Sequence, residues 1–161
     1  MDNLTVIEKK PSLFNLFPSK LRSISFHEKL RWLQQLLYGY RVCIYLLDGK
    51  EIGYHVISNG GNPRFPFVKK QDYLLGPSFI LPEYRGHNYN SQFKKIMIGR
   101  YGYNHKYYNF ISHDNIASLK STEHFGGQYL CDAKFTGFFR RLIPVNGDGD
   151  MKIFVTELEK E

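Results

Sequence analysis

The nine residues Pro82–Asn90, PEYRGHNYN, lie between an apolar run, YLLGPSFIL, and a segment with helical periodicity. A helix N-terminus carries backbone N–H groups without intrahelical partners and a partial positive charge, so it favours anions. Gly86 permits close backbone approach, Asn88 tolerates the left-handed conformation, and Arg85 could pair with a phosphate. Asn90 is also a good helix cap. This pattern indicates a phosphate-binding turn, although an ordinary polar loop would use similar residues.

Two motifs in the chain resemble the fingerprint of the GNAT superfamily of acetyl-CoA-dependent N-acetyltransferases. The first is an apolar strand followed by P-x-Y-R-G, matched here by Pro82, Tyr84, Arg85 and Gly86. The second is N-x-x-[AS]-x-x-x-Y-E-x-x-G-F, met by NIASLKSTEHFGG, where the matching residues are Asn115, Ser118, Glu123 and Gly126. The resemblance covers about Asp48 to Gly127, and it makes the turn far more specific than it is alone.

The resemblance implies acetyl-CoA as the acyl-donor cosubstrate and implies where it binds. The backbone of the strand before the turn would bond the pantetheine arm, through Phe79, Ile80 and Leu81. The turn would hold the pyrophosphate, through Arg85, Gly86, His87, Asn88, Tyr89 and Asn90. Asn115 and Ser118 would touch the CoA chain near its thiol. Lys94, Lys95 or Arg100 could meet the 3′-phosphate, unless they are solvated helix residues. No metal site is expected.

The sequence departs from the family pattern at three places. Two later glycines of the turn are replaced by Asn88 and Asn90, the second of which we expect to cap the helix. The tyrosine that often protonates the leaving thiolate is replaced by Thr122, a far poorer acid. The final phenylalanine is replaced by Gly127, which we interpret as a packing difference.

Direct transfer also needs a group that takes a proton from the attacking amine, which a histidine or carboxylate could do. His113 follows the strand after the cofactor helix and is the first candidate. His55 and Asp72 are the alternatives. For each of the three, a structural or surface role competes with the catalytic one.

These motifs need elements that position them. Ser25 and Glu28 have capping-box spacing before a helix over 26–38, with Leu30, Leu33, Leu36 and Leu37 at helical intervals. Asp48–Gly49 predicts a hairpin. Strands are expected near 4–8, 73–81, 107–112, 128–139 and 151–158, and helices near 89–101 and 115–125. The run 73–81 suits a central strand covered on both faces. We expect a helical turn at 11–18 and a loop over Pro144.

The composition fits one folded domain over residues 1–161. Of the 161 residues, 42% are hydrophobic and 16% aromatic, which excludes a disordered chain. No run is long enough to span a bilayer, and the N-terminus lacks a secretory signal. Cys43 and Cys131 fit reduced core thiols. We therefore expect a cytoplasmic α/β protein with a GNAT-like mixed, mostly antiparallel sheet of six to seven strands flanked by helices.

The expected function is acetyl transfer to a primary amine by direct attack. The net charge of +7 and the aromatic loops would suit an amino sugar as acceptor, while a peptide, a polyamine or an antibiotic amine remain alternatives. The lysines and arginines are dispersed, which disfavours nucleic acid as a partner, and no membrane partner is expected. A homodimer is an open expectation. The alternative function is a non-catalytic CoA-binding module or a basic nucleic-acid-binding module.

Overall fold

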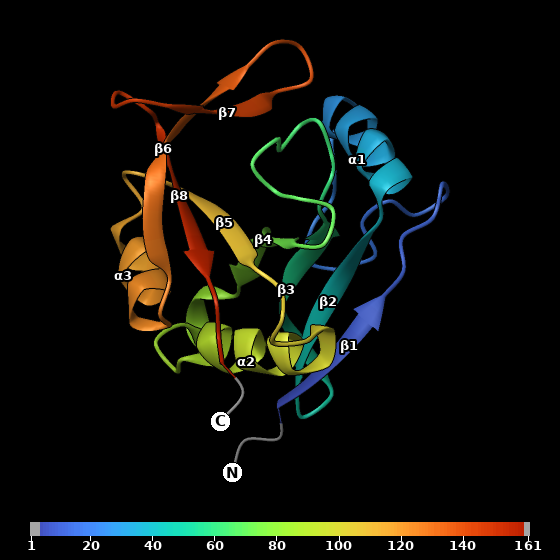
Figure 1. Cartoon of the computed structure of the whole chain (residues 1–161). Coiled ribbons are helices and arrows are strands. Elements are labelled where there is room, and N and C mark those ends of the chain that lie inside the picture. The colour runs from blue at the N-terminus through green and yellow to red at the C-terminus, as the bar shows by residue number, and fades with distance from the viewer. Residues whose placement is uncertain (1–3, 160–161) are drawn as a thin grey trace. The chain divides into compact units, whose positions relative to one another are not determined.

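The computed structural model describes residues 4–159 and forms two compact units (Figure 1). The first unit contains residues up to Ser58 together with Leu75–Lys94, and the second contains Asn59–Leu74 and the chain from Lys95 onward. Two elements are therefore shared substantially between the units, β4 (Tyr73–Ile80) and α2 (Tyr89–Tyr101), and β3 (Lys50–Asn59) ends one residue inside the second unit. That the whole chain acts as one domain stays a prediction.

The first unit is built on strands in the order β1-β2-β3-β4. Its other elements are β1 (Leu4–Lys9), α1 (Phe26–Tyr38), β2 (Tyr40–Leu47), β3 (Lys50–Asn59) and a 3-10 turn, η1 (Pro82–Tyr84). The predicted hairpin is confirmed, because Asp48 and Gly49 have φ of 48° and 79° as a type I′ turn requires.

Helix α1 begins and ends at the predicted residues. Ser25 Oγ accepts from the Glu28 N–H, and the Glu28 carboxylate accepts from the Ser25 N–H, which forms the predicted capping box. Trp32 and Leu36 pack against a core that contains Phe17, Tyr40, Val42, Ile44, Tyr54 and Val56. The predicted helical turn at 11–18 is wrong, because these residues form bends closed by reciprocal backbone bonds between Ser12 and Asn15.

The second unit continues the sheet in the order β4-β5-β8-β6-β7. Its elements are β5 (Tyr107–Ser112), α3 (Ile116–His124), β6 (Gln128–Thr136), β7 (Arg141–Val145) and β8 (Met151–Thr156). Only β4 and β5 pair in parallel among the registers of this unit. Its core is formed by Phe65, Val68, Leu74, Tyr108, Ala133, Leu142, Ile153 and Val155.

The sheet has eight strands, one more than the upper limit of the prediction. The additional strand is β7, which lies in the segment containing Pro144 that we expected to form a loop. Proline is tolerated at a sheet edge, and β7 lies at the edge of the order. Mixed α/β architecture with a mostly antiparallel sheet is confirmed.

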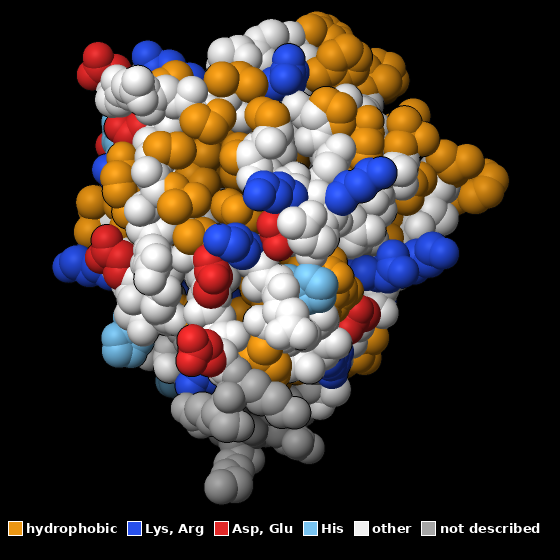
Figure 2. Space-filling view, viewed as in Figure 1, with side chains coloured by type: hydrophobic (Ala, Val, Ile, Leu, Met, Phe, Trp, Pro, Cys, Tyr) orange, Lys and Arg blue, Asp and Glu red, His pale blue; other side chains and the backbone are white. Residues whose placement is uncertain are grey.

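Two further findings concern burial. The expectation that β4 is covered on both faces holds for Leu74 and Leu75 only; Ser78 is exposed, and Phe79 and Ile80 are half-buried. On the face seen in Figure 2, lysines and arginines are scattered among other side chains and do not gather into one stripe. Within residues 4–159, no helix is long and apolar enough to cross a membrane.

Candidate acetyl-CoA site

The turn after β4 has the backbone that an anion site needs. Gly86 has φ of 84° and Asn88 has φ of 61°, so both lie in the left-handed region. Asparagine is one of the few residues that adopt this conformation at low cost, which explains how it replaces a glycine. Arg85, Gly86, His87 and Asn88 are exposed, and helix α2 begins at Tyr89, immediately after them. The turn therefore presents its backbone to solvent at a helix N-terminus.

The amide groups of this turn are available for a ligand. Across the described part of the chain, the N–H groups of Gly86, His87 and Asn88 donate no hydrogen bond of ordinary geometry. Orphan N–H groups that point from a turn at the start of a helix bind phosphate groups well. The arrangement fits a pyrophosphate, which can accept several such bonds at once.

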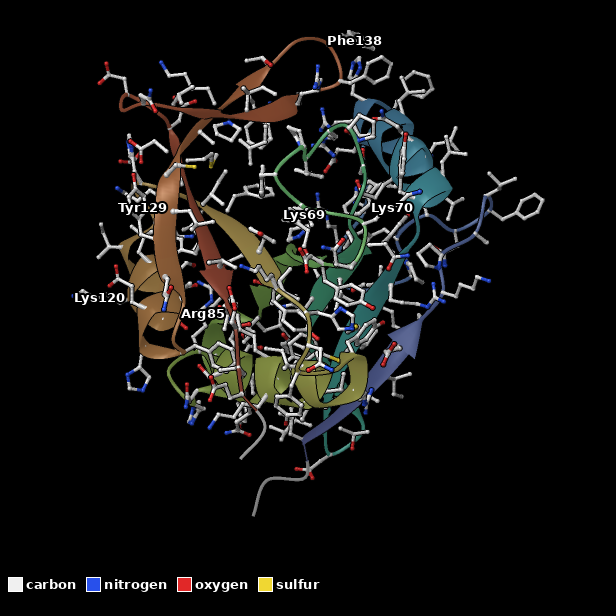
Figure 3. All side chains as sticks on the ribbon, in the orientation of Figure 1. Lys69, Lys70, Arg85, Lys120, Tyr129 and Phe138 are labelled. Carbon is white, nitrogen blue, oxygen red and sulfur yellow. The ribbon has the colours of Figure 1, made fainter. Side chains whose placement is uncertain are left out.

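Arg85 places a cation beside these amides, and its exposed side chain is labelled in Figure 3. Its Nε donates to the Ile80 carbonyl at 3.0 Å, and its guanidinium carbon lies 5.7 Å from the centre of the Phe79 ring. The bond through Nε leaves the two terminal nitrogens of the guanidinium for an anion. Arg85 is thus held by β4 with its charge toward the solvent.

The predicted pantetheine strand has some of its backbone groups already bonded. The Leu81 N–H donates to the Ile52 carbonyl at 2.9 Å, and the Ile80 carbonyl accepts from Arg85. Gly53 on β3 allows this close approach, because a Cβ there would lie 2.5 Å from the Phe79 carbonyl oxygen. Pairing of the pantetheine arm with this segment must therefore use groups other than the Leu81 N–H.

Asn90 does not cap α2, contrary to the prediction. It is the second residue of the helix, and its Oδ1 accepts from the Tyr45 hydroxyl at 3.4 Å. The same hydroxyl lies 3.2 Å from Nδ1 of His55. One proton arrangement satisfies both contacts: Nδ1–H of His55 donates to Tyr45, and Tyr45 donates to Asn90. The asparagine therefore connects the start of α2 to buried residues of β2 and β3.

His55, a predicted alternative base, lies in the interior with 2% of its surface exposed. Burial and the nearby charge of Lys94 lower the pKa of its imidazole to about 3, which the approach of Asn90 offsets only in part. Its ring stacks on Phe93 with centroids 4.8 Å apart. His55 is neutral near pH 7 and is enclosed by protein.

Lys94 differs from a solvated helix residue. It is buried on α2, and burial lowers the pKa of its ammonium group to about 8. A buried side chain of the first unit cannot serve as a surface contact for a 3′-phosphate, whereas Lys95 and Arg100 are exposed. No pattern in the sequence indicated that Tyr45 contacts Asn90 or that Lys94 is buried.

The second unit holds His113, Asn115, Ser118 and Thr122. His113 is half-exposed, and its Nε2 lies 3.0 Å from Oδ1 of Asp114, which leaves Nδ1 as its second nitrogen. Asn115 caps α3, because its Oδ1 accepts from the Ser118 N–H at 3.2 Å. This cap gives Asn115 a structural role in addition to any contact with CoA.

Thr122 is a structural residue in this unit. It is buried, and its Oγ1 accepts from Nδ2 of Asn109 at 3.2 Å. The Gly127 N–H donates to the Thr122 carbonyl, and a Cβ at Gly127 would lie 2.5 Å from Cγ2 of Thr122. Thr122 and Gly127, two of the departures from the family motif, are therefore in close contact with each other.

Asp72, the third candidate base, is also buried. Its Oδ1 accepts from the Lys106 N–H at 3.0 Å, and the residue stands immediately before β4. This bond ties the starts of β4 and β5 together, which is a structural role.

Comparison with solved structures identifies the architecture, whereas no family model and no curated protein sequence matches the chain. An acetyltransferase from Thermus thermophilus is 17% identical and superposes with a TM-score of 0.64, over 98% of this chain and 100% of that one. A putative acetyltransferase from Salmonella typhimurium, solved with its cofactor acetyl-CoA, is 15% identical with a TM-score of 0.54, over 97% and 95%.

A third similar structure is an acetyltransferase of the GNAT family from Streptococcus pneumoniae. It is 9% identical, with a TM-score of 0.55 over 96% of this chain and 100% of that one. These similarities extend over nearly the whole of both chains. The chain has the fold of the GNAT acetyltransferases.

Proposed function

We propose that this protein is an acetyl-CoA-dependent N-acetyltransferase. The observation that carries the proposal is the turn Arg85–Asn88 just before α2, which combines left-handed Gly86 and Asn88, amides that donate no bond of ordinary geometry and the arginine itself. The fold is one in which similar proteins are acetyltransferases. In this proposal the turn binds the pyrophosphate of CoA, and the half-buried end of β4 lies along the pantetheine arm.

The reaction would be a direct transfer. The neutral amine attacks the thioester carbonyl carbon, a C–N bond forms, the C–S bond breaks, and the amine proton passes to a base. We assign the base to His113, because its imidazole is half-exposed and is oriented by the Asp114 carboxylate. His55 and Asp72 are buried and already engaged, so we place them second. The CoA thiolate takes a proton from water, since Thr122 is enclosed and engaged with Asn109.

The acceptor we propose is the primary amine of a small molecule, with amino sugars as the first class to test. The support is the basic balance of the chain, which suits an anionic acceptor. Cytoplasmic location stays a prediction.

The decisive test is calorimetric titration with CoA, 3′-dephospho-CoA and pantetheine. The proposal expects the two CoA compounds to bind and pantetheine, which lacks the pyrophosphate, to bind at least about tenfold more weakly. Arg85→Gln should weaken CoA binding and leave pantetheine binding unchanged. Lack of binding by CoA would overturn the proposal. Binding without release of free CoA in a broad amine panel would favour a CoA-binding module, the function that the replacement by Thr122 suggests.

A further inference from the structure

Helix α1 carries a row of large apolar side chains on its outward face. Phe26, Leu30, Leu33 and Leu37 are 72%, 39%, 41% and 82% exposed, while Trp32 and Leu36 pack into the core on the other side. Hydrophobic side chains gather along the edge of the view where α1 and the chain before it lie (Figure 2). We call these four residues the α1 seam. A helix packed on its own sheet does not need such a row.

The spacing of the α1 seam selects a particular kind of partner. The four residues follow one another at steps of four, three and four, which is the alternation of d and a positions in a heptad. This gives a narrow stripe that interlocks with the side chains of another helix, unlike the broader face that packs on a sheet. The partner that certainly carries a matching stripe is a second copy of the chain.

The area available is sufficient for a stable pair. With roughly 150 to 200 Å² for each large apolar side chain, the exposed fractions of the α1 seam leave on the order of 400 Å² per chain. Leu13 is 69% exposed and Phe14 is fully exposed, and both line a hollow that Lys29 of α1 also lines. Including these two, a pair would bury on the order of 1,400 Å², within the range of specific interfaces.

The charges next to the α1 seam permit self-association. The flanking positions of the heptad are held by His27, Lys29, Gln34 and Leu36. When two copies lie antiparallel, Lys29 faces the position of the partner's Leu36, whose side chain packs into its own core, and His27 faces Gln34 of the partner subunit, so like charges do not oppose each other. The carboxylate of Glu28 is bonded within its own chain, to Arg22 and to the N–H of Ser25.

We propose that the protein forms a homodimer in which two α1 helices pack antiparallel about a two-fold axis through the α1 seam. In this register Phe26 lies opposite Leu37 of the partner subunit, and Leu30 lies opposite Leu33 of the partner subunit. Each contact occurs twice, so the interface closes on itself and does not propagate into a filament. Antiparallel helices also align their dipoles favourably. The inference does not depend on the acetyltransferase proposal.

The first experiment is sedimentation equilibrium on the full chain from about 1 to 100 μM. We expect a dimer, and we expect Leu33→Glu to raise the dissociation constant at least about 100-fold, because two carboxylates would enter an apolar interface. Lys134→Glu, an exposed charge change on β6, is the matched control and should leave the dimer unchanged. Leu33→Ala is a milder variant that keeps the helix intact and should weaken the dimer less.

A monomer at 100 μM would overturn the proposal. A dimer that Leu33→Glu leaves intact would also overturn it. So would a monomeric protein whose melting temperature is lowered by Leu33→Glu, because the α1 seam would then pack within its own chain. Binding of a monomer to anionic lipid vesicles through these residues would assign the face to a membrane instead. Because the readout is mass, none of these results bears on CoA binding.

Disulfide trapping tests the orientation. In a Cys131→Ser background, Leu30→Cys and Leu33→Cys chains mixed together should cross-link to each other faster than either does to itself. Faster formation of the Leu30→Cys homodimer would indicate a parallel pair and overturn the antiparallel register.

Discussion

The hydroxyl of Tyr45, on β2, lies 3.4 Å from Oδ1 of Asn90, in the first turn of α2. It also lies 3.2 Å from Nδ1 of His55. This hydroxyl therefore connects the start of α2 to buried residues of the first unit. The proposed pyrophosphate turn lies immediately before that helix. The asparagine that replaces a family glycine here has a tertiary role.

Tyr45→Phe should destabilise the protein by about 1 to 3 kcal/mol, because it removes the buried hydroxyl that bonds the half-buried Asn90 and the buried His55. Urea unfolding measures the free energy. Tyr129→Phe is the matched control: Tyr129 is an exposed tyrosine of β6 whose hydroxyl donates to Asp132, and its change should cost less than about 0.5 kcal/mol. Equal losses in the two variants would contradict the role given to Tyr45.

Asn88 tests the conformation of the turn. Because φ is 61°, Asn88→Gly should keep the affinity for acetyl-CoA within about twofold. Asn88→Val should lower stability by about 1 to 2 kcal/mol, since a β-branched residue resists the left-handed region, and should weaken acetyl-CoA binding about tenfold. Calorimetric titration and urea unfolding provide the two measurements. Asn146→Val, at an exposed bend with ordinary φ, should change neither.

The buried imidazole of His55 predicts a pH dependence of stability. Its pKa is about 3 in the folded chain against an ordinary 6.5, so between these values the unfolded chain binds more protons. Stability should therefore fall as the pH drops from about 6.5, by up to about 1.4 kcal/mol per pH unit. Between pH 6.5 and 5, where the carboxylates contribute little, His55→Gln should reduce this slope by about half a proton at pH 6.5, rising to nearly one proton at pH 5. An unchanged slope would show that His55 is not held neutral.

His113→Gln tests the proposed base. We expect kcat/KM to fall about 100- to 1,000-fold at neutral pH, while acetyl-CoA binding stays unchanged. Asp114→Asn should lower the rate less, since it removes only the partner of Nε2. His124→Gln is the control, because His124 is an exposed histidine at the end of α3. Full activity of His113→Gln would return the role to His55 or Asp72.

Local signals accounted for most of the fold. The capping box of Ser25 and Glu28 and the turn Asp48–Gly49 each depend on neighbours in the sequence, so α1 and the β2–β3 hairpin were predicted correctly. Strand β7 was missed because Pro144 disfavours a strand locally, and only its place at the sheet edge makes it acceptable.

The features of the candidate site that depend on backbone conformation were predictable, whereas those that depend on side-chain packing were not. Positive φ at Asn88 followed from the residue type and the motif. The contact of Tyr45 with Asn90 joins residues 45 positions apart, and the burial of Lys94 contradicts its residue type. The exposure of the α1 seam was not predictable either, because periodicity identifies an apolar face of a helix but not whether that face points toward the core or toward solvent.

Pro144 has a consequence for how chains can meet. An edge strand exposes unpaired N–H and C=O groups that another chain can use as a template, which is a route to aggregation. Pro144 lies near the end of a five-residue strand, opposite Ala133 of β6, and its nitrogen has no hydrogen to offer. A strand that approached this border of the sheet would lose one ladder bond and meet a rigid ring. The short, proline-bearing β7 thus protects the sheet against uncontrolled growth.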